Sequence, residues 1–164
     1  KALNPRHRVS TRAVIITPEG RFLLFLSHFD PGSGLPPQWV FPGGGLESDE
    51  EPFQGIVREV FEETGRLFEQ SHFEAFASIH HAMEDVRFHD SGFAHFFELK
   101  LSEPFDPISD NWTENEHRDT VMHRWLTLDE IVSEKLWVGP DGAIELLIER
   151  YGTPGSDPAP DQGS

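Results

Sequence analysis

Hydrophobic residues that alternate with polar ones predict several strands in this chain of 164 residues. The first two strands, at 10–17 and 21–29, are separated by the turn sequence PEG, which predicts a hairpin. The other predicted strands are short apolar and aromatic runs between turn or loop residues, at 38–41, 72–81, 92–101 and 123–128. Residues 102–120 show no clear periodicity, so we expect a long loop there.

Apolar residues spaced three or four apart predict a central helix over about Glu51 to Thr64. Pro52 near its start and Gly65 just past its end are typical helix boundaries. The residues that can supply its buried face are Phe53, Ile56, Val57, Val60 and Phe61. Gly55 lies inside this helix, where glycine is unfavourable, so we expect a tight packing contact on the sheet to compensate.

Two further helices are predicted near the end of the chain. Thr127 and Glu130 have the spacing of a capping box, so a helix should follow Thr127. A last helix should begin after Asp141 as its cap and stop at Gly152. Its predicted buried face consists of Ile144, Leu147, Ile148 and Tyr151.

The order of these elements predicts an α+β fold with a mixed sheet. At this length, with 37% hydrophobic and 12% aromatic residues, one domain over 1–152 is expected. Residues 153–164 are acidic and rich in proline and glycine, which predicts a disordered tail.

Composition excludes several kinds of chemical site and several kinds of partner. The chain has no cysteine, which excludes disulfides, thiolate zinc sites and a cysteine nucleophile. No apolar run approaches the roughly 20 residues of a membrane span, and no signal segment opens the chain, so we expect a cytoplasmic protein without a membrane partner. A net charge of -16 would repel a phosphate backbone, so no nucleic acid polymer is expected as a partner. An anionic substrate would need cations as mediators.

The central helix carries a cluster of acids. Glu59, Glu62 and Glu63 stand at positions i, i+3 and i+4, so their carboxylates converge on one patch. Like charges at this spacing repel, and Arg58 alone does not neutralise three carboxylates. Hard divalent cations such as Mg²⁺ prefer oxygen ligands and suit this arrangement. The alternative is a solvated acidic face on a helix of an acidic protein.

The spacing around these acids resembles a known signature. Gly44 is followed after five residues by Glu50 and after seven more by the pair Arg58–Glu59. With Glu62, Glu63 and Gly65, this is similar to the Nudix box of the Nudix hydrolases, and it extends from Gly44 to Arg66. Arg66 is the one departure, because the family usually has an aliphatic residue there. The flanking sequences WVFPGGG and HRWLTLDEI also resemble the surroundings of the box in that family.

The resemblance implies the Nudix α/β/α sandwich, with a mixed sheet between helices, and hydrolysis of a nucleoside diphosphate linked to another group with Mg²⁺ or Mn²⁺. Carried across by position, the metal ligands are Glu59, Glu62, Glu63 and the backbone carbonyl of Gly43. Arg58 would orient the carboxylates through charge-assisted hydrogen bonds, and Glu50 would tie the preceding loop to the helix. Glycines at 43–45 would let the backbone approach metal and phosphate closely.

The general base remains open, because the family uses either a glutamate of the box or one on a distant loop. Within the box, Glu62 is our first choice. On the loop the candidates are Glu114 and Glu116, and Glu116 is considered as an additional metal ligand or base, or as a plain surface residue.

Residues that would hold the rest of a substrate are less well defined. Trp112 and Trp39 could stack on a nucleobase, although a core role is expected more for Trp39. His80 and His81 end a predicted strand and should point to opposite faces, so only one, with His81 as the candidate, could enter a pocket. The marks of ADP-ribose and dinucleoside polyphosphate subfamilies are absent, which leaves nucleoside triphosphates or related nucleotides by elimination.

Two other interpretations remain open. A Nudix domain can serve as a nucleotide or nucleotide-sugar sensor without turnover, although loss of the glutamates would then be expected and they are intact here. A purely structural acidic domain would bind no divalent metal at this patch. Dimers are common in the family, so a homodimer is one assembly that the resemblance allows.

Overall fold

The computed structural model of the protein describes residues 7–28, 34, 36–82, 91–110, 112 and 114–152. Its strands are β1 His7–Ile16, β2 Arg21–Ser27, β3 Gln38–Val40, β4 Gly43–Gly45, β5 Phe73–Ala82, β6 Ser91–Lys100, β7 Thr120–Thr127 and β8 Val138–Gly139. Its α-helices are α1 Pro52–Thr64, α2 Glu114–Asp119, α3 Leu128–Ser133 and α4 Ala143–Tyr151, and Gln70–His72 forms a 3₁₀ turn, η2. Among these residues, no helix combines the length and the apolar character that a membrane crossing requires.

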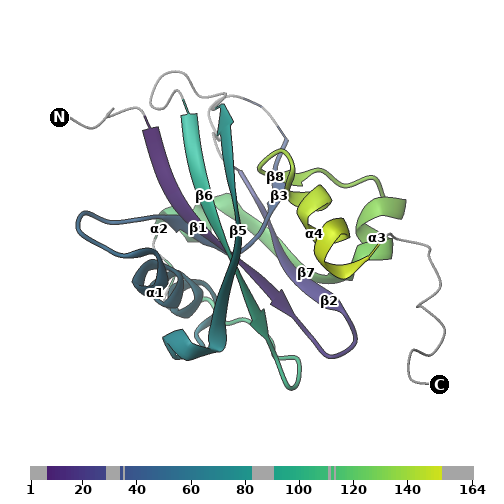
Figure 1. The fold of residues 1–164 in the computed structure, drawn as a ribbon, viewed down its shortest axis with the longest axis horizontal. Coiled ribbons are helices and arrows are strands. Elements are labelled where there is room, and N and C mark those ends of the chain that lie inside the picture. The colour runs from purple at the N-terminus through teal and green to yellow at the C-terminus, as the bar shows by residue number, and fades with distance from the viewer. Residues whose placement is uncertain are drawn as a thin grey trace.

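The strands form one mixed sheet, in the order β5-β6-β1-β2-β3-β8, with β4 paired to β1 and β7 paired to β2. The pairs β1·β6 and β3·β8 are parallel, and the other pairs are antiparallel. Figure 1 shows α1 on one side of this sheet and α3 and α4 on the other. The predicted α+β sandwich with a mixed sheet between helices is therefore confirmed.

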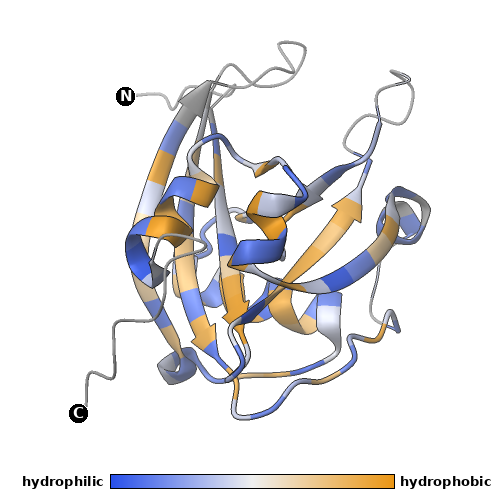
Figure 2. Ribbon diagram, turned by 90° about the vertical axis from the view of Figure 1, so that its right-hand side faces the viewer, coloured by the Kyte–Doolittle hydropathy of each residue, from blue (hydrophilic) through white to orange (hydrophobic). Residues whose placement is uncertain are grey.

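Alternation along β1 and β2 fills the two layers of core. Ala13, Ile15 and Leu23 point to the side of α1, where they meet Ile56 and Val60. Their neighbours point to the other side and pack under α3 and α4, and they include Val14, Phe22 and Leu24. Figure 2 shows hydrophobic residues concentrated along the strands, whereas the covering helices mix hydrophobic and hydrophilic residues. This period-two pattern is what a sheet covered on both faces requires.

The predicted elements agree closely with the structure, with four corrections. Residues 102–120 are not loop throughout, because they include α2, whose six residues are too few to show a helical period. Phe61 is 38% exposed, because it follows Val60 and is turned about 100° away from the buried stripe. The cap of α4 is Gly142 with a φ of 95°, whereas the carboxylate of Asp141 accepts a hydrogen bond from Trp137 Nε1.

The fourth correction concerns Gly55. A Cβ at this position would lie 2.3 Å from Cδ2 of Leu46 and 3.3 Å from Oε1 of Glu50. The close contact that excludes a side chain is therefore with the loop before α1 and not with the sheet. The predicted tail at 153–164 lies outside the described residues, so its disorder stays a prediction.

The hairpin of β1 and β2 opens away from its tip. Within these two strands, the register pairs Ile16 with Phe22 and no other residues. Farther along, β1 pairs with β4 and β6, and β2 pairs with β3 and β7. The two strands therefore diverge, as Figure 1 shows, and we call this opening the fork. A cleft lies where the fork meets α1 and α2, and it is described next as the candidate site.

Candidate metal centre

Local sequence explains how α1 presents its acids. Pro52 is the first helical residue, and the N–H of Glu51 donates to Oε1 of Gln54 at 2.9 Å. Gly65 ends the helix in the left-handed conformation, with a φ of 80°. Ile56 and Val60 anchor the helix to the sheet with no exposed surface. The glutamates occupy the adjacent stripe, where Glu59 is 7% exposed and its two neighbours are half-buried.

Glycine at 43 and 44 makes room for these acids. Gly44 lies against Glu59, and a Cβ there would be 2.7 Å from Oε2 of that carboxylate. Gly43 has a φ of 142°, and a Cβ on it would overlap the backbone oxygen of Thr11 at 2.0 Å. Neither position accepts a larger residue without displacing backbone or carboxylate. The glycines thus allow close approach of Glu59 and of the β1 backbone, whereas their approach to metal and phosphate stays a prediction.

Arg58 connects the carboxylates to one another and to the loop before α1. Its Nε and Nη2 donate to both oxygens of Glu50, at 2.7 and 2.9 Å. Its Nη1 donates to Oε2 of Glu59 at 3.0 Å and to Oε1 of Glu62 at 3.2 Å, and its Nη2 donates to the carbonyl of Gly45 at 3.2 Å. This geometry suits the roles proposed for Arg58 and Glu50, because a planar guanidinium fixes several oxygens at once.

A third acid joins the pair on α1 from a distant segment. One carboxylate oxygen each from Glu59, Glu62 and Glu116 lie within 4.8 Å of one another. Glu116 belongs to α2, so the loop glutamate that the sequence singled out lies at the same place as the acids of α1. Three carboxylates at this distance form an oxygen donor set of the kind that hard divalent cations prefer, so the residues present fit such an ion.

Glu63 lies beside this group and has a different contact. Its Oε1 accepts a hydrogen bond from the backbone N–H of Gly43 at 2.8 Å. Burial raises the pKa of the Glu63 carboxyl well above its usual range, and the nearby charge of Glu59 adds to the effect. Burial also raises the pKa of Glu59. Burial and mutual repulsion thus disfavour the charged forms of these acids, and a bound cation would offset both effects.

A cleft of about 250 Å³ opens beside the acids, between the strands of the fork. Arg8 and Arg12 of β1 line one side, and Glu63 and Glu116 line the side toward the helices. Nη1 of Arg12 donates to the carbonyl of Phe41 at 2.9 Å and to that of Gly43 at 3.4 Å. Burial lowers the pKa of Arg12 to about 10, so the guanidinium stays charged at neutral pH. Burial likewise lowers the pKa of Arg8.

The two arginines were missed by the sequence analysis. Arg8, Ser10 and Arg12 alternate with Val9 and Thr11, and this period of two places both arginines on one face of β1. That signal was present in the sequence, but it did not indicate that β1 pairs with the glycine strand β4 and so faces the acids.

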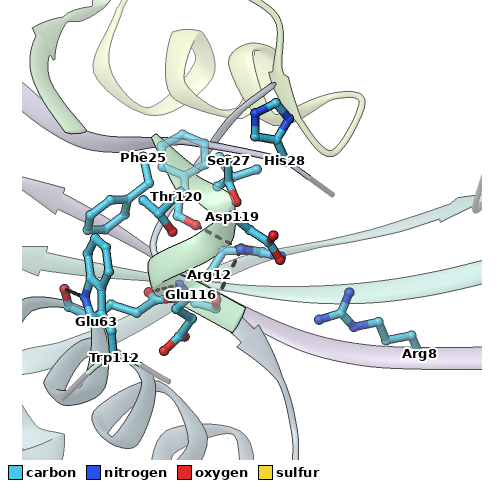
Figure 3. Close-up of a pocket in the computed structure, with 13 residues that line it drawn as sticks. Arg8, Arg12, Phe25, Ser27, His28, Glu63, Trp112, Glu116, Asp119 and Thr120 are labelled. Atoms are coloured by element: carbon cyan, nitrogen blue, oxygen red, sulfur yellow. Dashed lines mark hydrogen bonds between the residues drawn. The ribbon is translucent and has the colours of Figure 1, made fainter. Parts of the chain in front are cut away.

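The aromatic residues that the sequence suggests as substrate contacts lie in different parts of the fold. Trp112 lines the cleft, and its Nε1 donates to the carbonyl of Glu63 at 2.8 Å. Figure 3 shows its indole next to Glu63 and below Phe25. Trp39 packs against the core under α3 and α4 and is not among the residues that line the cleft. The side chain of His81 lies outside the described part of the chain, so its role stays a prediction.

The comparisons with known proteins agree with this geometry. A family model described as the NUDIX domain matches residues 6–147. A MutT-like protein of Streptomyces ambofaciens is 46% identical over 61 residues, which are 37% of this chain and 36% of that protein. Human diphosphoinositol polyphosphate phosphohydrolase 2 is 58% identical over 33 residues, which are 20% of this chain and 18% of the relative. The chain thus matches only about a third or less of the length of these curated relatives.

A solved structure extends the likeness to nearly the whole fold. The dihydroneopterin triphosphate pyrophosphohydrolase of E. coli aligns with a TM-score of 0.65 and 18% identity, over 86% of this chain and 92% of that chain. At this identity the likeness shows the fold alone. The family model spans most of the chain and includes every residue of the site described above. The chain therefore belongs to the Nudix hydrolase family, whose members act on phosphoanhydride bonds.

Proposed function

We propose that this protein is a pyrophosphohydrolase that depends on Mg²⁺ or Mn²⁺ and cleaves a phosphoanhydride bond in a nucleoside diphosphate linked to another group. We further propose a nucleoside triphosphate, or a related nucleotide, as the substrate. One observation carries the proposal: the carboxylates of Glu59, Glu62 and Glu116 converge beside a cleft that two arginines line. Acids for a cation and cations for an anion lie together, although the chain as a whole has a net charge of -16.

The chain's own residues have separate tasks in this proposal. The carboxylates of Glu59, Glu62 and Glu116 hold the cation, and Glu63 with the carbonyl of Gly43 completes its surroundings. A bound divalent cation withdraws charge from phosphate oxygens and lowers the pKa of a bound water. Arg58 keeps the acids of α1 in place through the hydrogen bonds described above.

Substrate positioning is assigned to the cleft. Arg8 and Arg12 neutralise the charge of the phosphates, and their burial strengthens this interaction because water screens it less. Glu62 takes the proton of the attacking water and so acts as general base. Glu116 is the alternative base, because it belongs to the same group of oxygens. The apolar part of the lining, to which the ring of Phe25 contributes, would hold the nucleobase.

The names of the relatives support phosphoanhydride chemistry and leave the substrate to experiment. One is named for diphosphoinositol polyphosphate and another for dihydroneopterin triphosphate. The test is a panel of nucleoside triphosphates, nucleotide sugars and a diphosphoinositol phosphate, with Mg²⁺ and with release of phosphate or pyrophosphate as the readout. We expect release from a nucleoside triphosphate and none after chelation of the metal.

A matched pair of variants makes the test specific. Glu59→Gln should abolish release, whereas Glu149→Gln, which makes the same change of charge on an exposed part of α4, should leave it unchanged. Equal turnover by wild type and Glu59→Gln would refute the assignment of the cation site. Tight nucleotide binding without any cleavage would instead support a sensor domain.

A further inference from the structure

The loop before α2 completes the C-terminal end of α1. The last carbonyls of a helix lack partners within the helix and need them from elsewhere. The backbone N–H of Ile108 donates to the carbonyl of Thr64 at 3.0 Å, and Nε1 of Trp112 donates to that of Glu63 at 2.8 Å. Ile108 also covers Gly65, where a Cβ would lie only 2.2 Å from Cγ1 of Ile108. The loop is therefore fitted to this helix end by backbone, side-chain and steric contacts.

Trp112 is held in this position from several sides. Its ring meets the ring of Phe25 edge-on at 6.1 Å between centroids, and the ring of His117 lies 5.3 Å away. Its backbone N–H donates to the carbonyl of Ser109 at 3.0 Å, and its side chain packs against the core under α1. The indole N–H points toward α1, as Figure 3 shows, so this edge is engaged in a protein contact.

Glu116 follows Trp112 by four residues, on the short helix α2. Six residues form too short a helix to be stable alone, so the position of α2 depends on what anchors it. At one end α2 continues directly into β7, which pairs with β2. At its other end, α2 follows the loop whose residues Ile108 and Trp112 are hydrogen-bonded to α1. The carboxylate of Glu116 reaches Glu59 and Glu62 from between these anchors.

We propose that Trp112 is a positioning residue, whose indole hydrogen bond to the carbonyl of Glu63 sets α2 so that Glu116 completes the cation site with Glu59 and Glu62. The inference rests on the proposed function. It assigns Trp112 a task different from stacking on a nucleobase, because it acts through Glu116 and not through contact with the substrate. This hydrogen bond thereby connects the segment that supplies Glu116 to the helix that supplies Glu59 and Glu62.

The test compares Mn²⁺ binding to the full chain, measured by electron paramagnetic resonance, in wild type and Trp112→Phe. Phenylalanine keeps an aromatic ring and removes the N–H. We expect about tenfold weaker binding, which is the lower end of what the loss of an outer partner of a metal ligand costs. The matched control is Trp137→Phe, which also removes an indole N–H bond of 2.8 Å, here to Asp141, and should leave the Mn²⁺ affinity unchanged.

A double-mutant cycle shows whether Trp112 acts through Glu116. If it does, Trp112→Phe should weaken Mn²⁺ binding little further in a protein that already carries Glu116→Gln. Equal effects of Trp112→Phe in the two backgrounds would overturn the inference. With nucleotide as substrate, Trp112→Phe should raise the Mg²⁺ concentration for half-maximal rate and leave KM for the nucleotide unchanged at saturating Mg²⁺. A raised KM alone, with normal Mn²⁺ affinity, would indicate stacking and overturn the inference.

A metal-free measurement separates this inference from the proposed function. The amide of Ile108, which donates to Thr64, should exchange its hydrogen faster in Trp112→Phe without any metal, because the loop is then less firmly docked. Unchanged exchange would overturn the inference. If the Ile108 amide of wild type exchanges as fast as an amide without a hydrogen bond, and wild type binds no Mn²⁺, both proposals fail. Normal Mn²⁺ binding in wild type and in Trp112→Phe would overturn the inference alone.

Discussion

Among the residues that the structure describes, two acids are buried, and their surroundings differ in charge balance. Glu98 on β6 is 3% exposed, and Glu59 on α1 is 7% exposed. Both oxygens of Glu98 accept hydrogen bonds from Arg150, at 3.0 and 3.1 Å, and the hydroxyl of Tyr151 donates to Oε2 as well. Burial would raise the pKa of Glu98, but these hydrogen bonds outweigh it and the pKa falls below its usual range.

Around Glu59 the balance is reversed. Arg58 divides its donors among Glu50, Glu59 and Glu62, and the pKa of Glu59 is raised because burial outweighs this partner. A buried acid whose partners satisfy it completely holds the fold together. A buried acid with a perturbed pKa beside a cleft marks a candidate functional site, which agrees with the proposed cation site at Glu59. The difference separates a structural cluster, Glu98 with Arg150 and Tyr151, from the cluster on α1.

The largest expected difference between the Glu98 cluster and the cluster on α1 is in the rate of pyrophosphate release. Glu62→Gln should lower kcat by about 10²–10⁴-fold, because the proposed general base is lost. Its thermal unfolding should not become easier, since the change removes repulsion between carboxylates. The measurement is pyrophosphate release beside a melting curve. A normal rate in this variant would move the role of base to Glu116 and would also contradict Glu62 as a ligand of the cation.

The second effect is stabilisation by metal. A ligand that binds only the folded state at 100 times its Kd stabilises by about 2.7 kcal/mol. Mn²⁺ should therefore raise the Tm of wild type and of Glu98→Gln by similar amounts. Removal of the metal with a chelator should reverse the shift. Glu59→Gln should show little shift, and a full shift in that variant would place the cation elsewhere.

The third effect is on stability at the structural cluster. Glu98→Gln should lower the free energy of unfolding by roughly 1.5–3 kcal/mol, the range for hydrogen bonds that involve charged groups. Urea unfolding measures this loss. The rate per folded molecule should stay at the wild-type value, because Glu98 and Arg150 are not among the residues that line the cleft. A lower rate would show that the clusters are coupled.

The smallest expected effect is the pH dependence of the unfolding free energy that Glu98→Gln removes. The pKa of Glu98 is lower in the folded protein than its ordinary value, so its contribution to stability is fully present above that ordinary value, about 4.3. The contribution is lost as the pH falls through the folded-state pKa. The stability difference between wild type and Glu98→Gln should therefore shrink in acid. A difference that stays constant down to pH 3 would mean that the charge of Glu98 is not what stabilises the cluster.

Sequence reasoning succeeded where the determining interactions are local. The helix from Pro52 to Thr64 follows from its periodicity and its boundary residues, and the glutamates at i, i+3 and i+4 follow from the helix itself. The fold and the family were also predicted and are confirmed. The grouping of Glu116 with Glu59 and Glu62 was expected only through the family resemblance, and the catalytic roles of these residues remain predictions.

The rest depends on contacts between distant segments. That Arg8 and Arg12 face the acids depends on the pairing of β1 with β4, which no spacing in the sequence specifies. The bond from Trp112 to Glu63 depends on how the loop returns to α1, across 49 positions of sequence. The hydrogen bond from Gly43 to Glu63 also joins distant segments. The sequence alone therefore does not distinguish Glu63 from Glu59 and Glu62.

The fork between β1 and β2 has a mechanical consequence. Its strands share one residue pair at the hairpin tip, and beyond it each strand is bonded to other partners. The opening is nonetheless bridged, because only Phe41 and Pro42 separate β3, which pairs with β2, from β4, which pairs with β1. This two-residue bridge sets the width of the opening, and it is held to β1 because the carbonyls of Phe41 and Pro42 accept hydrogen bonds from Arg12 and from the backbone N–H of Ala13.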